Sequence, residues 1–160
     1  MNHVKNESRR REVYGLLKSV INDPSLTKYQ TIIGASARGR VVPPPSSVIF
    51  EALYEGKIIG GIYFGQEWET LYSSFDYKIA QRLSQELSCI HAIAVEETFR
   101  DQDVGSLLID KMEKLLISEG LHCIYGVANK SLEKFYTGRG FTFGSSPGEK
   151  IFLISKILDP

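Results

Sequence analysis

The chain has 160 residues, of which 42% are hydrophobic, and its nineteen basic residues balance nineteen acidic ones. This length suits one compact domain with a buried core, spanning residues 1–160. The zero formal charge disfavours nucleic acid and anionic membranes as partners, because both attract an excess of positive charge.

No apolar run approaches the roughly 20 residues of a membrane span, and the polar first residues lack the core of a secretory signal. We therefore expect a cytoplasmic protein. Cys89 and Cys123 both fall in apolar runs, where free thiols behave as small hydrophobic residues. No spacing of metal ligands occurs, so no metal is expected.

The first segment shows helical periodicity. Apolar residues recur every three or four positions over 7–22, which predicts an amphipathic helix, and a shorter helix is expected over 24–33. The proline-rich segment 34–47 predicts a surface loop. Its Arg38 and Arg40 could hold an anionic part of a substrate, although solvated loop arginines are the commoner case.

Two β-rich runs at 48–54 and 57–64, separated by Glu55-Gly56, predict a hairpin with a tight turn. The stretch that follows is rich in aromatic residues, which could line an acceptor pocket or, as is commoner, pack a helix onto the sheet. These residues are Trp68, Tyr72, Phe75 and Tyr77.

Helices and strands then alternate along the chain. Ile79, Leu83 and Leu87 mark a short helix, and the apolar run 89–95 predicts a strand buried on both faces. A long helix ended by Gly120 follows, with one apolar stripe made of Val104, Leu107, Leu108, Met112, Leu115 and Leu116.

The last part of the chain predicts a strand at 121–127, a helix at 131–139 that Gly140 ends, and strands at 141–145 and 151–157. This order of elements favours an α/β layered fold. Its central sheet should be mixed and flanked by helices, with a parallel pair of strands at its centre.

The junction between the strand at 89–95 and the long helix is the strongest functional signal. A helix start presents unpaired backbone N–H groups, and the helix dipole adds positive potential. Gly105 removes a side chain where a phosphate would approach the backbone. The residues alone therefore indicate an anion site.

The same junction resembles the acetyl-CoA signature of the GNAT superfamily of N-acetyltransferases: Gln or Arg, two residues, Gly, one residue, then Gly or Ala. Arg100 and Gly105 match its ends. A second signature of that superfamily is matched in order and spacing by Asn129, Phe135, Tyr136, Gly140 and Phe141. Together the two signatures cover roughly residues 89 to 144.

This resemblance implies that acetyl-CoA is the co-substrate and that the amine of a small molecule attacks its thioester directly, in a ternary complex. It assigns cofactor binding to Ile93, Val95, Arg100, Asp101, Gln102, Asp103, Val104, Gly105, Ser106 and Asn129. It makes Tyr136 the proton donor to the departing thiolate, with simple packing as the alternative role.

Within the superfamily, residues 90–108 are most similar to the arylalkylamine (serotonin) N-acetyltransferases. By this similarity, His91 occupies the position of a histidine that is implicated in proton removal in that family, while Cys89 replaces the family's second histidine. A neutral core histidine is the alternative role of His91. Glu96 and Glu97 are alternative bases.

The sequence departs from the family pattern at two points. Asp103 replaces the first glycine of the signature, and we expect it to serve as the N-cap of the long helix. The family usually begins with a strand, which here should be very short or absent.

Two other functions remain open: acetylation of a protein or aminoacyl-tRNA amine, and a non-catalytic acetyl-CoA-binding module. The neutral overall charge weighs against a tRNA substrate. If the chain associates with itself, the expected assembly is a homodimer.

Overall fold

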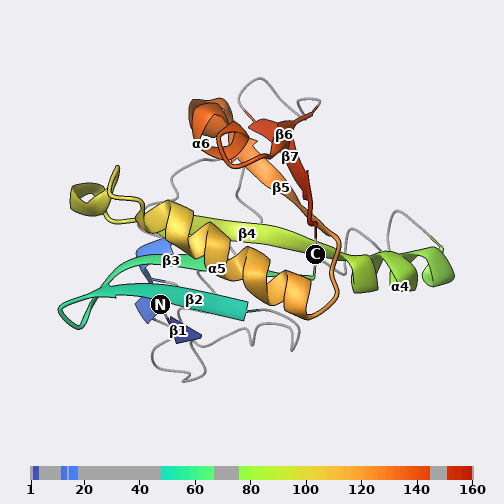
Figure 1. Cartoon of the computed structure of the whole chain (residues 1–160), viewed down its shortest axis with the longest axis horizontal. Coiled ribbons are helices and arrows are strands. Elements are labelled where there is room, and N and C mark those ends of the chain that lie inside the picture. Colours follow the sequence, from blue (N-terminus) through green and yellow to red (C-terminus); the bar gives the residue numbers. More distant parts are fainter. Residues whose placement is uncertain are drawn as a thin grey trace. The chain divides into compact units, whose positions relative to one another are not determined.

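The computed structural model describes residues 2–3, 12–13, 15–17, 48–66, 76–144 and 151–159. Within them, strands are hydrogen-bonded in the order β1-β2-β3-β4-β5-β7-β6 (Figure 1). β4 and β5 pair in parallel, whereas the β2–β3 and β5–β7 pairs are antiparallel. The predicted α/β fold with a mixed sheet, flanking helices and a parallel pair is therefore confirmed.

The chain forms two compact units. Residues 1–64 and 91–112 make up the first unit, and residues 65–90 and 113–160 make up the second. The boundary divides both β4 (Leu87–Val95) and α5 (Val104–Ser118). One domain over 1–160 stays a prediction.

The first unit contains the predicted hairpin, formed by β2 (Val48–Tyr54) and β3 (Lys57–Gly65, whose last residue belongs to the second unit). Glu55 and Gly56 both have positive φ, 50° and 78°. This is the backbone of a type I′ turn, whose twist matches that of the strands it joins. The very short first strand is β1 (Asn2–His3), which pairs with β2.

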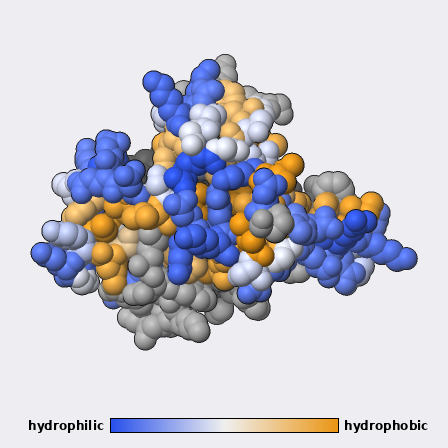
Figure 2. All heavy atoms as spheres, viewed as in Figure 1, coloured by the Kyte–Doolittle hydropathy of each residue, from blue (hydrophilic) through white to orange (hydrophobic). Residues whose placement is uncertain are grey.

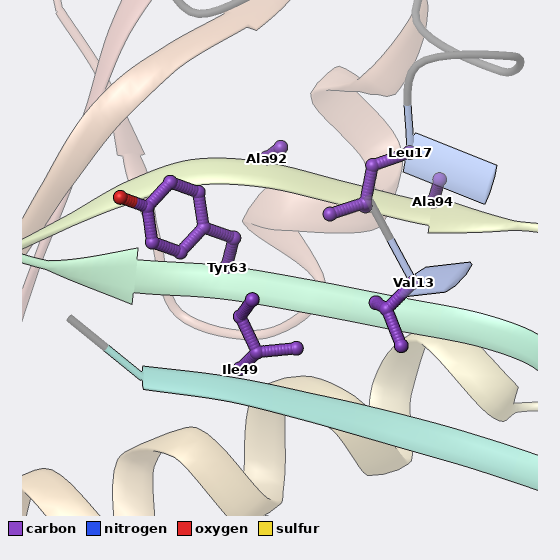
Figure 3. Close-up of a cluster of buried hydrophobic side chains, with 6 residues drawn as sticks. All are labelled: Val13, Leu17, Ile49, Tyr63, Ala92 and Ala94. Atoms are coloured by element: carbon purple, nitrogen blue, oxygen red, sulfur yellow. The ribbon is translucent and has the colours of Figure 1, made fainter. Parts of the chain in front are cut away.

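One core cluster of the first unit joins a helical segment to the strands. Residues 12–13 and 15–17 are helical, as the periodicity over 7–22 predicts. Figure 3 shows the cluster, which consists of Val13, Leu17, Ile49, Tyr63, Ala92 and Ala94. Gly61 permits this close packing, because a Cβ there would lie 2.6 Å from Cγ1 of Val13.

Helix α5 buries Val104, Leu108, Ile109, Met112 and Leu116. The predicted stripe is wrong at one position, since Leu107 is 52% exposed. The buried strip includes Ile109 instead, because the contact with the sheet, not residue type, decides which part of the helix is covered. Hydrophilic residues cover much of the exposed side of α5 (Figure 2).

The end of α5 is a Schellman motif. The amide of Gly120, with φ 76°, donates to the carbonyl of Ile117, and the amide of Leu121 donates to the carbonyl of Leu116. Gly120 ends the helix as predicted. Because Leu121 completes this cap, β5 begins later than predicted, at Cys123, and runs to Asn129.

The rest of the second unit places short elements beside β5. β7 (Ile151–Ile157) has its predicted bounds, whereas β6 is only Thr142–Phe143. The helix predicted at 131–139 is a 3-10 turn (Lys130–Leu132) followed by α6 (Glu133–Thr137). Gly140, with φ 81°, follows it as expected.

Helix α4 (Tyr77–Glu86) begins at Asp76, whose carboxylate accepts from the amides of Lys78 and Ile79. The stripe predicted for this helix is wrong. Ala80 and Ser84 are its buried residues, Ile79 is 48% exposed, and Leu87 already belongs to β4. Small side chains allow close packing, which periodicity of large apolar residues does not reveal.

Several predictions lie outside the described residues. They are the helix at 24–33, the loop at 34–47 with Arg38 and Arg40, and the aromatic residues Trp68, Tyr72 and Phe75.

Cys89 and Cys123 are free thiols, as expected, and burial raises the pKa of Cys123. Among the described helices, none combines the length and apolar character needed to cross a membrane.

Candidate functional site

The parallel ladder between β4 and β5 is short. Leu87–Ile90 pair with Cys123–Gly126, and beyond Gly126 β5 still pairs with β7 as far as Asn129. Burial in β4 changes at the same point. Ser88, Cys89 and Ile90 are buried in succession, but from His91 to Val95 buried alanines alternate with half-buried residues. The prediction of burial on both faces therefore holds only for the first part of β4.

His91 is half-buried in β4 and packs against a buried tyrosine of the first unit. Its ring centroid lies 4.7 Å from that of Tyr63, with an interplanar angle of 37°. Its neighbours Ile93 and Val95 are also half-buried. Partial exposure suits proton removal, yet a packed imidazole could also be structural. The catalytic role of His91 stays a prediction.

The segment 96–103, which we call the cofactor loop, leads from β4 to α5. It contains one 3-10 turn (Glu97–Phe99) and then the exposed residues 100–103. Arg100 Nε donates to the carbonyl oxygen of Val95 at 3.3 Å, and Gln102 Nε2 donates to that of Thr98 at 2.9 Å. These two side chains fold the loop back on itself at the start of α5.

Asp103 differs from its predicted role as an ordinary N-cap. An N-cap residue has extended backbone, but Asp103 has φ 60°, in the left-handed region that favours glycine. Asp101 has φ 58°. Asp is one of the few other residues that tolerates this region. Asp103 thus replaces the signature glycine at a position whose backbone conformation suits glycine.

The first turn of α5 offers donors for an anion. The carbonyl of Asp103 accepts from the amide of Leu107 at 2.9 Å, the first helical hydrogen bond of α5. The amides of Val104, Gly105 and Ser106 therefore have no acceptor within the helix. Three such donors at the positive end of a 15-residue helix can bind a pyrophosphate.

Gly60 allows the first turn of α5 to pack closely against the sheet. Sequence reasoning missed this role. A Cβ at Gly60 would lie 3.1 Å from Cγ1 of Val104 and 3.2 Å from the carbonyl oxygen of Ala94. The available signal was the Gly60-Gly61 pair inside a strand run, since glycine within a strand often marks a close approach.

The two alternative bases differ in their surroundings. The Glu96 carboxylate lies 3.5 Å from Lys57 Nζ, and its amide donates to the carbonyl of Ile59. Glu97 is exposed. The Glu96 carboxylate is thus already engaged by an ammonium group, whereas Glu97 is exposed, and the role of each as an alternative base stays a prediction.

Asn129 and Tyr136 belong to the second unit. The side-chain oxygen of Asn129 accepts from the amide of Ser131 at 3.0 Å, so Asn129 caps the following 3-10 turn. Its alternative role, a plain cap, is thus present. Its side-chain NH2 group is the part that could orient pantetheine.

Tyr136 is 3% exposed and lies between two phenylalanine rings. Its ring makes edge contacts with Phe135 at 5.0 Å and Phe141 at 5.3 Å. Burial raises the pKa of Tyr136, so the phenol is protonated at neutral pH and can donate a hydrogen bond. The packing role is visible, and the catalytic role stays a prediction.

The predicted site residues therefore fall into two groups. The first unit carries His91, Ile93, Val95 and the segment 100–106, and the second carries Asn129 and Tyr136. The first group supplies backbone donors and the Arg100 guanidinium, which fit the phosphates of acetyl-CoA. Where side chains are described, no three His, Cys, Asp or Glu residues gather as a metal site would require.

The model of the acetyltransferase (GNAT) family matches residues 12–141. No curated protein matches the chain. The narrower similarity to serotonin N-acetyltransferases is therefore not shown by these comparisons and stays a prediction.

Solved structures share the fold at low sequence identity. Tetrahymena GCN5 matches with a TM-score of 0.67 and 15% identity, over 100% of this chain and 98% of that one. An aminoglycoside 6'-N-acetyltransferase complexed with coenzyme A gives 0.65 and 15%, over 100% and 98%. The ribosomal-protein-S18-alanine N-acetyltransferase from Escherichia coli gives 0.65 and 11%, over 99% and 93%.

Proposed function

Because the chain belongs to the acetyltransferase (GNAT) family, we propose that it transfers the acetyl group of acetyl-CoA to the amine of a small molecule. Family membership confirms the expected enzyme class. The main support for acetyl-CoA binding is the start of α5. The cofactor loop leads from β4 to this point, where three backbone amides have no acceptor within the helix.

Different residues would bind the pyrophosphate and the pantetheine arm of acetyl-CoA. The amides of Val104, Gly105 and Ser106 would receive the pyrophosphate, and Arg100, whose Nε donates to the carbonyl of Val95, adds positive charge to the same loop. Asp101, Gln102 and Asp103 would contribute through their backbone, which the loop presents. Ile93 and Val95 lie beyond the four-pair ladder to β5, so their backbone groups would pair with the pantetheine arm. Asn129 would orient that arm.

The acceptor must lose a proton before or during attack. An alkyl amine titrates near 10, so most of it is protonated at neutral pH. In our proposal, His91 removes the proton, directly or through water. The amine nitrogen then bonds to the acetyl carbon, and backbone N–H groups of Ile93 or Val95 stabilise the charge on the oxygen.

Collapse of the intermediate breaks the C–S bond, releases the second proton of the amine nitrogen to solvent and leaves the coenzyme A thiolate. A thiol titrates near 8.5, whereas burial raises the pKa of Tyr136 above its usual 10. Complete transfer of the phenolic proton is therefore unfavourable. We propose that Tyr136 stabilises the thiolate by a hydrogen bond and that the thiolate takes its proton from solvent.

The acceptor is the least constrained part of the proposal. Structures with this fold include enzymes named for an aminoglycoside and for a ribosomal protein, so the fold does not choose between them. The similarity of residues 90–108 to arylalkylamine N-acetyltransferases favours a small amine. The zero net charge disfavours aminoacyl-tRNA.

The direct test measures thiol release when the protein is mixed with acetyl-CoA and arylalkylamines, polyamines or lysine peptides. The proposal predicts release with a small amine and a higher melting temperature with acetyl-CoA. A melting temperature unchanged by millimolar acetyl-CoA would overturn it. A shift in melting temperature without thiol release would favour a binding module. A cytoplasmic location and a homodimer stay predictions.

A further inference from the structure

The tip of the β2–β3 hairpin presents two side chains together. Tyr54 and Lys57 are the last cross-strand pair before the turn at Glu55-Gly56. Directly opposed residues of an antiparallel pair point to the same side of the sheet. The register shifts between Ala52 and Leu53, and such an irregularity turns the end of a hairpin.

Both side chains contact the cofactor loop, one at each end of its 3-10 turn. The Tyr54 ring lies 5.4 Å from that of Phe99, at an interplanar angle of 51°. Lys57 Nζ lies 3.5 Å from Glu96 Oε2. A backbone hydrogen bond from Glu96 to Ile59, at 2.8 Å, fastens the same end of the loop to β3.

The rest of the loop needs such support. Residues 100–103 are exposed, and Asp101 and Asp103 both hold positive φ, which a non-glycine residue adopts only when its surroundings maintain it. A loop that must be ordered on binding has lower affinity than one already in the bound conformation.

We propose that the hairpin tip keeps the cofactor loop in its binding conformation, with Tyr54 and Lys57 as positioning residues for acetyl-CoA. This inference rests on the proposed function, because it assumes that the loop binds the cofactor. Tyr54 acts through Phe99, and Lys57 acts through Glu96.

The first experiment measures amide hydrogen exchange of residues 97–103 without cofactor. Tyr54 is 55% exposed, so Tyr54→Ala should leave the fold intact. We expect exchange about 3- to 10-fold faster in Tyr54→Ala and a smaller change in Lys57→Ala, because exposed ion pairs are weak. Tyr54→Phe should restore protection, since the contact is between rings. Tyr77→Ala, at another tyrosine that is 66% exposed, is the matched control.

The second experiment measures coenzyme A affinity of the same variants by calorimetry. The dissociation constant should rise in Tyr54→Ala, by at most the factor found for the exchange rate, and stay at the wild-type value in Tyr77→Ala. Wild-type exchange in the Tyr54→Ala, Lys57→Ala double variant would overturn the inference, as would faster exchange with unchanged affinity. Failure of wild-type protein to bind coenzyme A would instead refute the proposed function.

Discussion

The carbonyl of Asp103 accepts the first helical hydrogen bond of α5 from Leu107, while Asp103 itself has a left-handed φ of 60°. The residue therefore begins the helix with a backbone conformation that glycine adopts more easily. Asp103 is also exposed, and it directly precedes the residues whose amides should receive a pyrophosphate.

Replacing Asp103 separates these two effects. Asp103→Asn keeps a residue tolerant of left-handed φ and removes the charge, so acetyl-CoA should bind a few-fold tighter at low salt. Asp103→Gly should do the same and also raise the free energy of unfolding by up to about 1 kcal/mol. Calorimetry at two salt concentrations checks the charge effect, which salt should weaken. Asp76→Asn, which keeps the N-cap of α4, should change neither quantity. Equal affinity of Asp103→Asn and wild type at low salt would show that the carboxylate points away from the cofactor.

Gly60→Ala should disturb the packing of the first turn of α5 against the sheet. The added Cβ would lie 3.1 Å from Val104 Cγ1 and 3.2 Å from backbone, so the first turn must shift. We expect about 1 to 3 kcal/mol lower stability and weaker coenzyme A binding. Gly15→Ala is the control: a Cβ at Gly15 meets nothing within 4 Å, and alanine favours the helix there. Urea unfolding and calorimetry check both variants. Unchanged coenzyme A affinity in Gly60→Ala would argue against a role of this contact in binding.

Asn129 can be tested for a role beyond its cap. Serine caps as well as asparagine but lacks the NH2 donor, so Asn129→Ser should keep stability within about 0.5 kcal/mol and weaken acetyl-CoA binding several-fold. Asn129→Ala should lose both, with about 1 kcal/mol of stability. Thermal unfolding and equilibrium binding separate the two effects. If Asn129→Ser binds acetyl-CoA like wild type, the cap observed at Ser131 is its whole function.

Tyr136→Phe should lower kcat about tenfold and leave acetyl-CoA affinity nearly unchanged, because the proposed hydrogen bond forms as the thiolate departs. The rings of Phe135 and Phe141 still pack against the new phenylalanine, so the fold should persist. Steady-state kinetics and direct binding give the two numbers. Equal losses in kcat and affinity would assign Tyr136 to ground-state binding.

The burial of Tyr136 should also make the free energy of unfolding depend on pH in the alkaline range. Burial raises its pKa in the folded state, so above pH 10 the unfolded chain releases this proton while the folded chain keeps it. The contribution of Tyr136 to the free energy of unfolding is therefore fully present below pH 10. Above pH 10 the free energy of unfolding falls by up to about 1.4 kcal/mol per pH unit, until the pKa of Tyr136 in the folded state is reached. Urea unfolding of wild type and Tyr136→Phe at about pH 9 and about pH 11, roughly one unit on either side of the ordinary value, isolates this residue from the other tyrosines. A parallel decline in both proteins would exclude Tyr136 as the cause.

The elements that the sequence predicts best are those with local causes. The type I′ turn at Glu55-Gly56 and the helix stop at Gly120 depend on backbone conformations that glycine makes accessible, and both are found where predicted. The loop between β4 and α5 was also expected, because a helix start follows a strand there, while its binding of a phosphate stays a prediction.

Other features depend on contacts between distant parts of the chain. Leu107 and Ile79 are apolar and periodic, yet they are exposed, because the neighbouring elements cover a different strip of each helix. The contact between Tyr54 and Phe99 joins residues far apart in the sequence, and no periodicity encodes it. The left-handed φ of Asp103 was hidden for another reason: aspartate at a helix start usually indicates an ordinary cap.

The four residue pairs between β4 and β5 also bear on the order of folding. Parallel strands cannot be joined by a tight turn, so these pairs can close only across the whole crossover through α5, which makes them slow, long-range contacts. The cofactor loop is part of that crossover. A substitution that loosens it should therefore slow refolding, and acetyl-CoA binding should increase the folded population by mass action.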